Sequence, residues 1–422
     1  VGYNSAYRNQ PDYKRFRYNV DGSSSSLFIP NGAAQTFLLG RTYINMDESS
    51  YTAAFNLDKR IKVGDEKELD FKAGLFYEDK VRDFGARNIG YVKSTPSFQT
   101  TLPIDQLFSP QNFNSRTGVK IDEQTNPNDS YKATNNLIAA YASVNYALGK
   151  KFNAIAGIRA EQNSQKLNSA DLVGKAINYD NTRLDLLPSM NVTYNFTEKS
   201  LLRLAYGKTL NRPEFRELAP FSFYNFLNDN LTSGDPKLQR ALINNYDARL
   251  EYFPGEGQVI SVSGFYKDFQ NPIELILRTG TSGTPELYYR NVGAVKSYGT
   301  EIEYRMKLDF LSKDTSSFWK NFTFYTNASL IRSKVDLSAV SGQAEYPNSS
   351  RPMQGQSPFI INAGIFYANE NALNVSLSYN LVGQRIAIAG SIQEPSVWEN
   401  GRNVIDFQIS KTFKDKYEVK LN

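Results

Sequence analysis

The sequence predicts an all-β chain, and specifically a transmembrane antiparallel up-and-down β-barrel. Segments in which apolar and polar side chains alternate recur along nearly all 422 residues, and a period of two is typical of β-strands. Every second connection between these segments is short and the others are long, as in a meander with tight turns on one rim of an outer-membrane barrel. The polar strand faces carry too many charges for a dry core.

The segment 200–211 illustrates the alternation. Leu202, Leu204 and Tyr206 share one face, whereas Arg203 points to the other. The strand is expected to end at Asn211-Arg212-Pro213, because proline has no N–H to donate to a neighbouring strand. We expect the apolar face to contact lipid and the charged face to line the lumen.

The same pattern predicts fourteen strands and a partial fifteenth at residues 417–422. Short turns, assigned to the periplasmic rim, are expected near residues 65, 150, 198, 255, 314, 370 and 415. Long extracellular loops are expected near residues 92–130, 162–182, 212–243, 278–287, 332–356 and 386–402. The chain is predicted to be one domain, residues 1–422, with no separate second unit.

Composition narrows the function classes. The 27 Tyr and 27 Phe suit strands and a membrane interface, and no apolar run reaches the roughly 18 residues of a spanning helix. The chain has no Cys and no His, which excludes Cys/His zinc sites and histidine-dependent catalysis within it. The net charge of +5 is too dispersed to favour nucleic acid binding.

Neither end of the sequence reads as a natural terminus. The first residues lack the pattern of a signal peptide, and the last ones stop within an alternating segment. Because unpaired strand edges are not tolerated in lipid, we expect further strands from outside this chain. A soluble sandwich or propeller is the alternative fold, although the repeat of about 40 residues typical of a propeller is not found.

Several segments resemble one family. They are YGKTLNRPEFRELAPF, GDPKLQRALINNYDARLEYFPGEGQVISVSGFYKDFQNPIE, YRNVGAVKSYGTEIEYR, RPMQGQSPFIINAGIFY and RNQPDYKRFRY. In this order they look like the C-terminal barrel portion of TonB-dependent outer-membrane receptors, closest to those of Bacteroidetes-type Gram-negative bacteria. The resemblance spans nearly the whole chain.

The resemblance implies a barrel of about 22 strands around an N-terminal plug, of which this chain would supply about strands 7 to 21. It implies active import of a siderophore, vitamin, glycan or peptide, driven by TonB, ExbB and ExbD through the plug region outside this chain. Outer-membrane lipid, lipopolysaccharide and a surface lipoprotein are the other partners expected. The alternative is a structural or secretion-associated barrel that does not transport.

The longest aromatic loop is the candidate ligand site. Convergent arginines and aromatic rings can pair an anion or stack on a sugar or chelate; the alternative is that the aromatic side chains pack the loop on itself or lie in the aromatic girdle at the membrane interface. The candidate ligand-binding residues are Arg212, Arg216, Phe221, Phe223, Tyr224 and Phe226.

The charged strand faces are expected to line the lumen and contact the plug rather than the substrate. These residues are Arg159, Glu161, Arg203, Arg249, Glu251, Glu301, Glu303 and Arg305. No metal site, cofactor or catalytic residue is predicted, because no carboxylate pair stands at a defensible spacing for acid–base chemistry. The chain is therefore not expected to be an enzyme.

Overall fold

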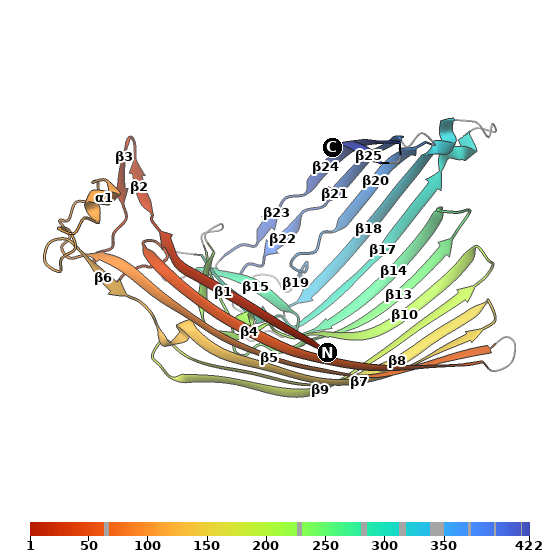
Figure 1. Cartoon of the computed structure of the whole chain (residues 1–422), viewed down its shortest axis with the longest axis horizontal. Helices are drawn as coiled ribbons and strands as arrows, with labels where there is room; N and C mark the ends of the chain where they lie inside the picture. Colours follow the sequence, from red (N-terminus) through yellow and green to blue (C-terminus); the bar gives the residue numbers. More distant parts are fainter. Residues whose placement is uncertain are drawn as a thin grey trace.

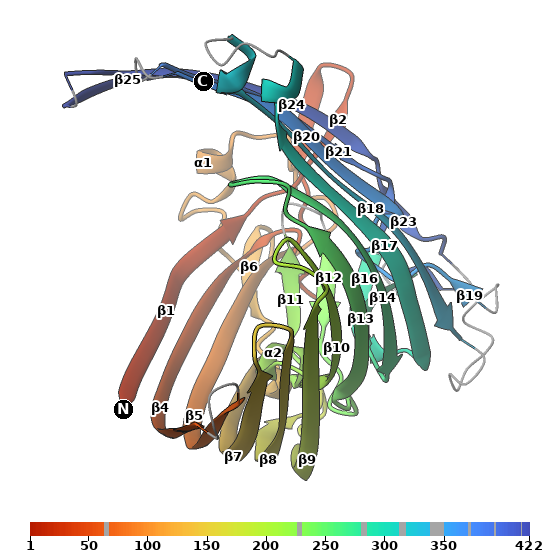
Figure 2. The same ribbon diagram turned by 90° about the vertical axis from the view of Figure 1, so that its right-hand side faces the viewer.

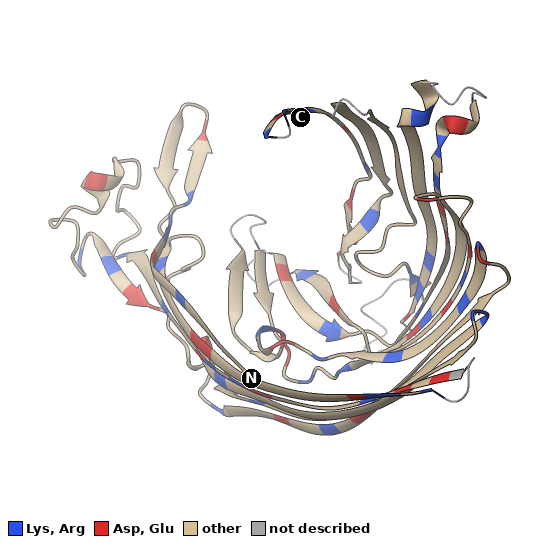
Figure 3. Cartoon of the chain, turned by 45° about the vertical axis from the view of Figure 1, so that its right-hand side comes forward, with Lys and Arg blue, Asp and Glu red and all other residues tan. Residues whose placement is uncertain are grey.

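The computed structural model describes residues 1–62, 67–225, 230–279, 285–311, 318–337, 350–369, 373–391, 394–414 and 416–422. They form one large antiparallel sheet that curves into an open trough (Figure 1). Each long strand pairs with the next along the chain. Among the described residues, the first and last strands each have one long neighbour, and Figure 3 shows the opening between these edges.

The described part of the sheet has fourteen long strands and one short final strand, as the alternation predicts. They are β1 (Gly2–Arg15), β4 (Gly40–Lys62), β5 (Lys67–Lys93), β7 (Ser130–Leu148), β8 (Phe152–Ala170), β9 (Ala176–Asn195), β10 (Ser200–Asn211), β13 (Ala241–Tyr252), β14 (Val259–Gln270), β17 (Ala294–Lys307), β18 (Phe322–Asp336), β20 (Phe359–Ala368), β21 (Leu373–Val382), β24 (Arg402–Phe413) and β25 (Tyr417–Leu421).

The outer face of the sheet is apolar and uncovered. In the row that crosses β10, β13, β14 and β17, Leu202, Leu250, Val262 and Ile302 are cross-strand partners. Val262 and Ile302 are about half exposed, at 51% and 50%. A soluble sheet would bury such a face, whereas a membrane barrel turns it toward lipid. The predicted orientation of Leu202, Leu204 and Tyr206 away from the lumen is thereby confirmed.

The tight turns lie at one end of the strands. Three of the predicted turns connect β7 to β8, β9 to β10 and β13 to β14. In the first, Gly149 has φ +54°, a left-handed conformation that glycine adopts without steric cost. The turns predicted near residues 65, 314, 370 and 415 lie outside the described residues.

The long connections at the other end contain structure of their own. Their elements are β2 (Tyr18–Asp21), β3 (Ser24–Leu27), α1 (Ile104–Leu107), β6 (Val119–Glu123), η1 (Pro127–Asp129), α2 (Phe215–Leu218), β11 (Ser222–Asn225), β12 (Asn230–Ser233), β15 (Ile273–Thr279), β16 (Pro285–Asn291), β19 (Ser350–Arg351), β22 (Arg385–Ile388) and β23 (Val397–Glu399). Two short helices, η2 (Leu308–Leu311) and η3 (Phe318–Asn321), lie at the end with the tight turns.

The loop expected near 162–182 is instead a β-hairpin. β8 continues to Ala170 and β9 begins at Ala176, with every residue between 162 and 170 paired across the two strands. The sequence there is polar on both faces, so the apolar alternation disappears while the backbone pairing continues. Alternation therefore reports where a strand meets lipid, not where the strand ends.

Two connections, between β10 and β13 and between β14 and β17, fold into the trough rather than away from it. β11, β12, β16 and β15 form a separate four-stranded sheet inside the curve of the main sheet (Figure 3). Figure 2 shows α2 and β11 facing the inner side of β4, β5 and β7. There, the connection between β10 and β13 buries Phe215, Leu218 and Phe221 against Phe84 and Tyr131 of the wall. None of the described helices is long and apolar enough to cross a membrane.

Candidate functional site

A pocket of about 460 Å³ opens inside the trough, at the strand ends that carry the long connections. We call it the mouth pocket. Its volume falls within the range of small-molecule sites. It is lined by Arg8, Gln10, Tyr13, Arg15, Ala34, Gln35, Thr36, Phe37, Thr42, Ile44, Asn88, Gln124, Asn126, Asn128, Asp129, Leu172, Arg216, Phe221, Ser222, Phe223, Tyr224, Asn225 and Leu231.

A β-bulge in β1 places two arginines on the same wall of this pocket. The register of β1 against β4 shifts between Gln10 and Tyr13, and Asp12 has φ +65°. An inserted residue reverses the facing of every side chain that follows it. Arg8 before the bulge and Arg15 after it therefore both line the mouth pocket, although strict alternation would put them on opposite faces.

Arg15 is stacked between aromatic rings. Its guanidinium carbon lies 4.0 Å from the ring centroid of Tyr224 and 5.0 Å from that of Tyr13. Its Nε is buried and has no hydrogen-bond partner among the described residues. Within the described part of the chain, Arg15 makes no ion pair with a carboxylate, since Asp12 pairs with Arg41 and Lys14. A buried donor of this kind favours an anionic acceptor.

Arg216 supplies a second cation from the opposite side of the pocket. The short helix α2 begins with a capping box in which Glu217 accepts the backbone N–H of Glu214 at 2.9 Å. Arg216 projects from this helix with its guanidinium carbon 4.1 Å from the centroid of Phe223. Among the residues that the structure describes, no carboxylate forms an ion pair with it. Like Arg15, Arg216 makes a cation–π contact with an aromatic ring.

The aromatic residues of β11 connect the pocket to the wall of the trough. Phe221 is 4% exposed, and its centroid lies 5.0 Å from that of Phe84 and 4.3 Å from that of Phe223. Phe223 and Tyr224 are half-buried and keep faces toward the pocket. Phe221 therefore anchors the loop, while Phe223 and Tyr224 present rings beside the cations.

Polar groups close the floor of the pocket. Asn128 donates to the carbonyl of Pro220 at 3.3 Å, yet its Oδ1 is buried with no partner among the described residues. Asp129 accepts hydrogen bonds from the Asn126 N–H at 2.8 Å and the Asn88 amide at 3.0 Å. Burial nevertheless raises the pKa of Asp129 above its ordinary value, against these hydrogen bonds, which lower it.

Arg212 is placed differently from the other predicted ligand residues. It pairs with Glu161 at 2.9 Å and with Asp185 at 3.4 Å on the inner wall. Arg240, at the other end of the same connection, pairs with Asp185 at 2.6 Å. Asp185 is 4% exposed, so these ion pairs hold both ends of the loop against the sheet. Arg212 does not line the mouth pocket.

The structure thus brings together four of the six predicted ligand residues, namely Arg216, Phe221, Phe223 and Tyr224. Phe226 lies outside the described residues. Sequence reasoning missed Arg8, Tyr13 and Arg15, which belong to a strand distant in sequence. The signal that could have found them is Pro11-Asp12, a pair unsuited to a regular strand.

The charges predicted for the lumen face inward and largely pair with one another. Arg203 and Arg249 both bind Glu251, at 2.9 and 2.6 Å, and Arg249 also binds Glu303 at 2.6 Å. Arg159 binds Glu161 at 2.6 Å. Ser263 and Ser329 hydroxyls lie 3.4 and 3.3 Å from Glu301 oxygens. Arg305 is exposed near the rim with the tight turns and forms no ion pair with a described residue.

The inner wall is therefore wet and ionic without forming a metal centre. Within the described ranges, no group of three or more acidic side chains could hold a metal ion. The ion pairs bridge neighbouring strands rather than converging on one point. Contact of these residues with a plug stays a prediction.

The whole chain, residues 1–422, matches the family model "TonB dependent receptor-like, beta-barrel". Among curated protein sequences, none matches it. Solved structures share the fold. The chain is 12% identical to the ferric citrate transporter FecA, with 93% of this chain and 50% of FecA covered and a TM-score of 0.61. The chain is also 12% identical to the siderophore receptor PiuA from Acinetobacter baumannii, with 90% of this chain and 52% of PiuA covered and a TM-score of 0.62.

The copper transporter OprC is 16% identical, with 92% of this chain and 52% of OprC covered and a TM-score of 0.59. At such identities the likeness concerns the fold alone, and the chain spans about half the length of these structures. The prediction of an all-β antiparallel barrel sheet is confirmed, as is its location in the bacterial outer membrane. The family is one of receptors and not of enzymes. This chain belongs to the TonB-dependent receptor β-barrel family.

Proposed function

We propose that the protein containing this chain imports an anionic nutrient across the outer membrane under TonB control, and that the mouth pocket captures it. One observation carries the proposal. Arg15 and Arg216 each stack on an aromatic ring within the same pocket, and neither forms an ion pair with a described carboxylate. Two such cations favour a ligand bearing carboxylate, phosphate or catecholate oxygens.

The rings define the second part of the ligand surface. Tyr224, Phe223 and Phe37 border the same pocket, and Phe37 lies 6.2 Å from Tyr224 between centroids. Rings of this kind accommodate a flat or apolar ligand face beside the charged groups. FecA carries ferric citrate, a carboxylate chelate, so this compound is a suitable first probe. The sequence resemblance supports a receptor of the Bacteroidetes type, with a surface lipoprotein as a further partner.

The proposal is tested by binding to the intact receptor in detergent. Ferric citrate, a ferric catecholate, cobalamin, a neutral oligosaccharide and a peptide pool would be titrated into the wild type and into the Arg15→Gln/Arg216→Gln double variant. Each charged hydrogen bond lost costs about 1.5–3 kcal/mol. Binding of an anionic probe should therefore weaken at least about tenfold for each arginine replaced.

Arg183→Gln is the matched control, because Arg183 is an exposed arginine of the β8–β9 hairpin that does not line the pocket. The affinity of the Arg183→Gln variant for each probe should equal that of the wild type. Tight binding of a neutral probe that both variants retain would overturn capture by the arginines. Uptake that continues in cells lacking TonB would overturn active import and favour a passive barrel.

A further inference from the structure

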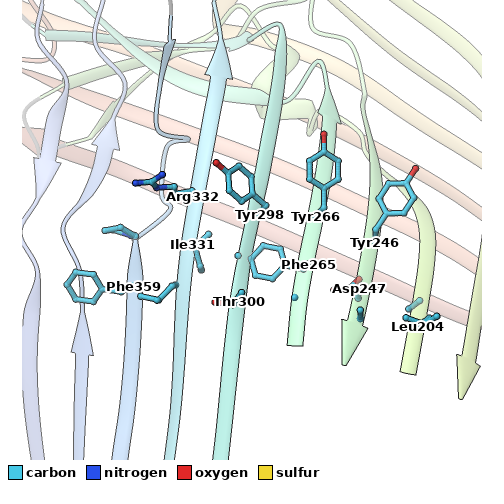
Figure 4. Close-up of a pocket in the computed structure, with 16 residues that line it drawn as sticks. Leu204, Tyr246, Asp247, Phe265, Tyr266, Tyr298, Thr300, Ile331, Arg332 and Phe359 are labelled. Atoms are coloured by element: carbon cyan, nitrogen blue, oxygen red, sulfur yellow. The ribbon is translucent and has the colours of Figure 1, made fainter. Parts of the chain in front are cut away.

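The floor of the mouth pocket offers hydrogen-bond acceptors that an anionic group of a ligand does not use. Asp129 and Asn128 line the pocket and are only 6% and 8% exposed. The depression on the outer face of the sheet is different. It has a volume of about 970 Å³, and apolar and aromatic side chains such as Leu204 and Tyr246 predominate in its lining (Figure 4). That lining is typical of a surface that faces lipid, whereas buried acceptors inside the trough require a donor.

A chain of hydrogen bonds holds Asp129 in place and occupies one of its two oxygens. The Thr42 hydroxyl donates to Asn88 Oδ1 at 3.0 Å, which fixes the amide so that its Nδ2 faces Asp129. Asn88 Nδ2 and the Asn126 backbone N–H both donate to Asp129 Oδ2, at 3.0 and 2.8 Å. Among the described residues nothing donates to Oδ1 of Asp129, so this oxygen remains for a ligand.

The negative charge of Asp129 is not compensated within the described part of the chain. No lysine or arginine there forms an ion pair with it, and burial raises its pKa although its two hydrogen bonds lower it. Two carboxylates on β1 and β6 are different, because Asp12 pairs with Arg41 and Glu123 pairs with Arg87. A buried carboxylate without a cation is costly, so Asp129 favours a ligand that brings a positive charge.

Asn128 supplies a second acceptor, next to Asp129 in the chain. Its Nδ2 donates to the carbonyl of Pro220 at 3.3 Å, and its Oδ1 is buried with no partner among the described residues. A protonated primary amine has three N–H donors and can bond to both acceptors, whereas a hydroxyl group has only one. The floor therefore suits an ammonium group better than a hydroxyl group.

We infer that the mouth pocket selects an amphoteric ligand, in which a protonated primary amine binds Asp129 and Asn128 while an anionic group binds Arg15 and Arg216. The ligand class is thus an aminocarboxylate or a similar compound that carries both charges. This inference rests on the proposed function, because it assigns a second chemical group to the ligand captured there. Asp129 is its specificity-determining residue, since this carboxylate attracts an amine and repels an anion that lacks one.

The test uses two matched sets of tripeptides that contain glutamate and phenylalanine. One set has free amino termini and the other has acetylated amino termini, so the sets differ only in the ammonium group. Each tripeptide and ferric citrate would be titrated into the intact receptor in detergent. The variant Asp129→Asn keeps the shape of the side chain and removes its charge. Asp180→Asn is the matched control, because Asp180 pairs with Lys166 on the β8–β9 hairpin and does not line the pocket.

The wild type and Asp180→Asn should bind a free-amine tripeptide at least about tenfold more tightly than its acetylated form, because acetylation removes a charged hydrogen bond. In Asp129→Asn this preference should disappear, while ferric citrate, which has no amine, should bind at least as tightly as to the wild type. Equal binding of both tripeptide forms by the wild type, or a preference that persists in Asp129→Asn, would overturn the inference. So would a wild type that binds ferric citrate but none of the tripeptides.

Other outcomes separate this inference from the proposed function. If Asp129→Asn weakens all probes equally, Asp129 supports the structure of the pocket and does not select an amine, although anion capture stands. If Arg15→Gln/Arg216→Gln binds ferric citrate and both tripeptide forms as the wild type does, anion capture by the arginines is wrong, and the amphoteric ligand is overturned with it.

Discussion

Replacing Phe221 with alanine should release the loop that carries Arg216 from the wall of the trough. The ring is 4% exposed and packs on Phe84 and Phe223 at centroid distances of 5.0 and 4.3 Å. Truncating a buried phenylalanine costs about 3–5 kcal/mol. If this cost falls on the local opening of the loop, the open population rises about a hundredfold to a few thousandfold.

Amide hydrogen exchange of residues 213–225 in the intact receptor measures this opening. Exchange should accelerate there and stay unchanged in the wall strands β5 and β7. Val173→Ala is the matched control, because Val173 is 87% exposed at the tip of another hairpin and should leave protection unaltered. Unchanged protection in Phe221→Ala would show that packing on Phe84 does not hold the loop. The account of how Arg216 is positioned in the mouth pocket would then be wrong.

Three further outcomes are expected. Asp185→Asn should remove the ion pairs of Asp185 with Arg212 and Arg240 and make the loop susceptible to limited proteolysis, since breaking a buried ion pair costs about 3–5 kcal/mol; a resistant loop would contradict the tethering. Burial raises the pKa of Asp129, so on acidification this carboxylate is protonated before carboxyls of ordinary pKa. Binding of ferric citrate should therefore strengthen on acidification more in the wild type than in Asp129→Asn, and equal pH profiles would refute this. Glu251→Gln should lower the temperature at which the barrel unfolds in detergent, because it removes the ion pairs with Arg203 and Arg249. An unchanged unfolding temperature would show that Glu251 does not stabilise the pairing of these strands.

The strands and their facing could be predicted because the outer face meets a solvent of different polarity from the inner one. Leu202, Leu204 and Arg203 show this directly, since a register error of one residue would put Arg203 into lipid. Where the side chains on both faces are largely polar, the signal vanishes. The sequence therefore predicts a loop at 162–182, whereas in the structure residues 162–170 pair with residues 176–184 as a hairpin.

The candidate site could be predicted only in part. An aromatic loop with arginines is visible in the sequence, and Arg216, Phe223 and Tyr224 do meet in one pocket. Arg15 comes from a strand about 200 residues earlier, and its facing depends on the bulge at Asp12, which alternation alone does not register. Arg212 has the same chemistry as Arg216, yet its partners Glu161 and Asp185 are distant in sequence and decide its structural role.

The central claim is that the mouth pocket captures an anionic ligand for TonB-driven import. Its most direct test is cellular uptake of iron from ferric citrate through the intact receptor, with the wild type, Arg15→Gln/Arg216→Gln and Arg183→Gln compared in cells with and without TonB. We predict uptake by the wild type and Arg183→Gln that requires TonB, and a loss of at least about a hundredfold in the double variant, about tenfold for each arginine. Uptake by the double variant at the wild-type rate, at ferric citrate concentrations well below saturation, would contradict the account.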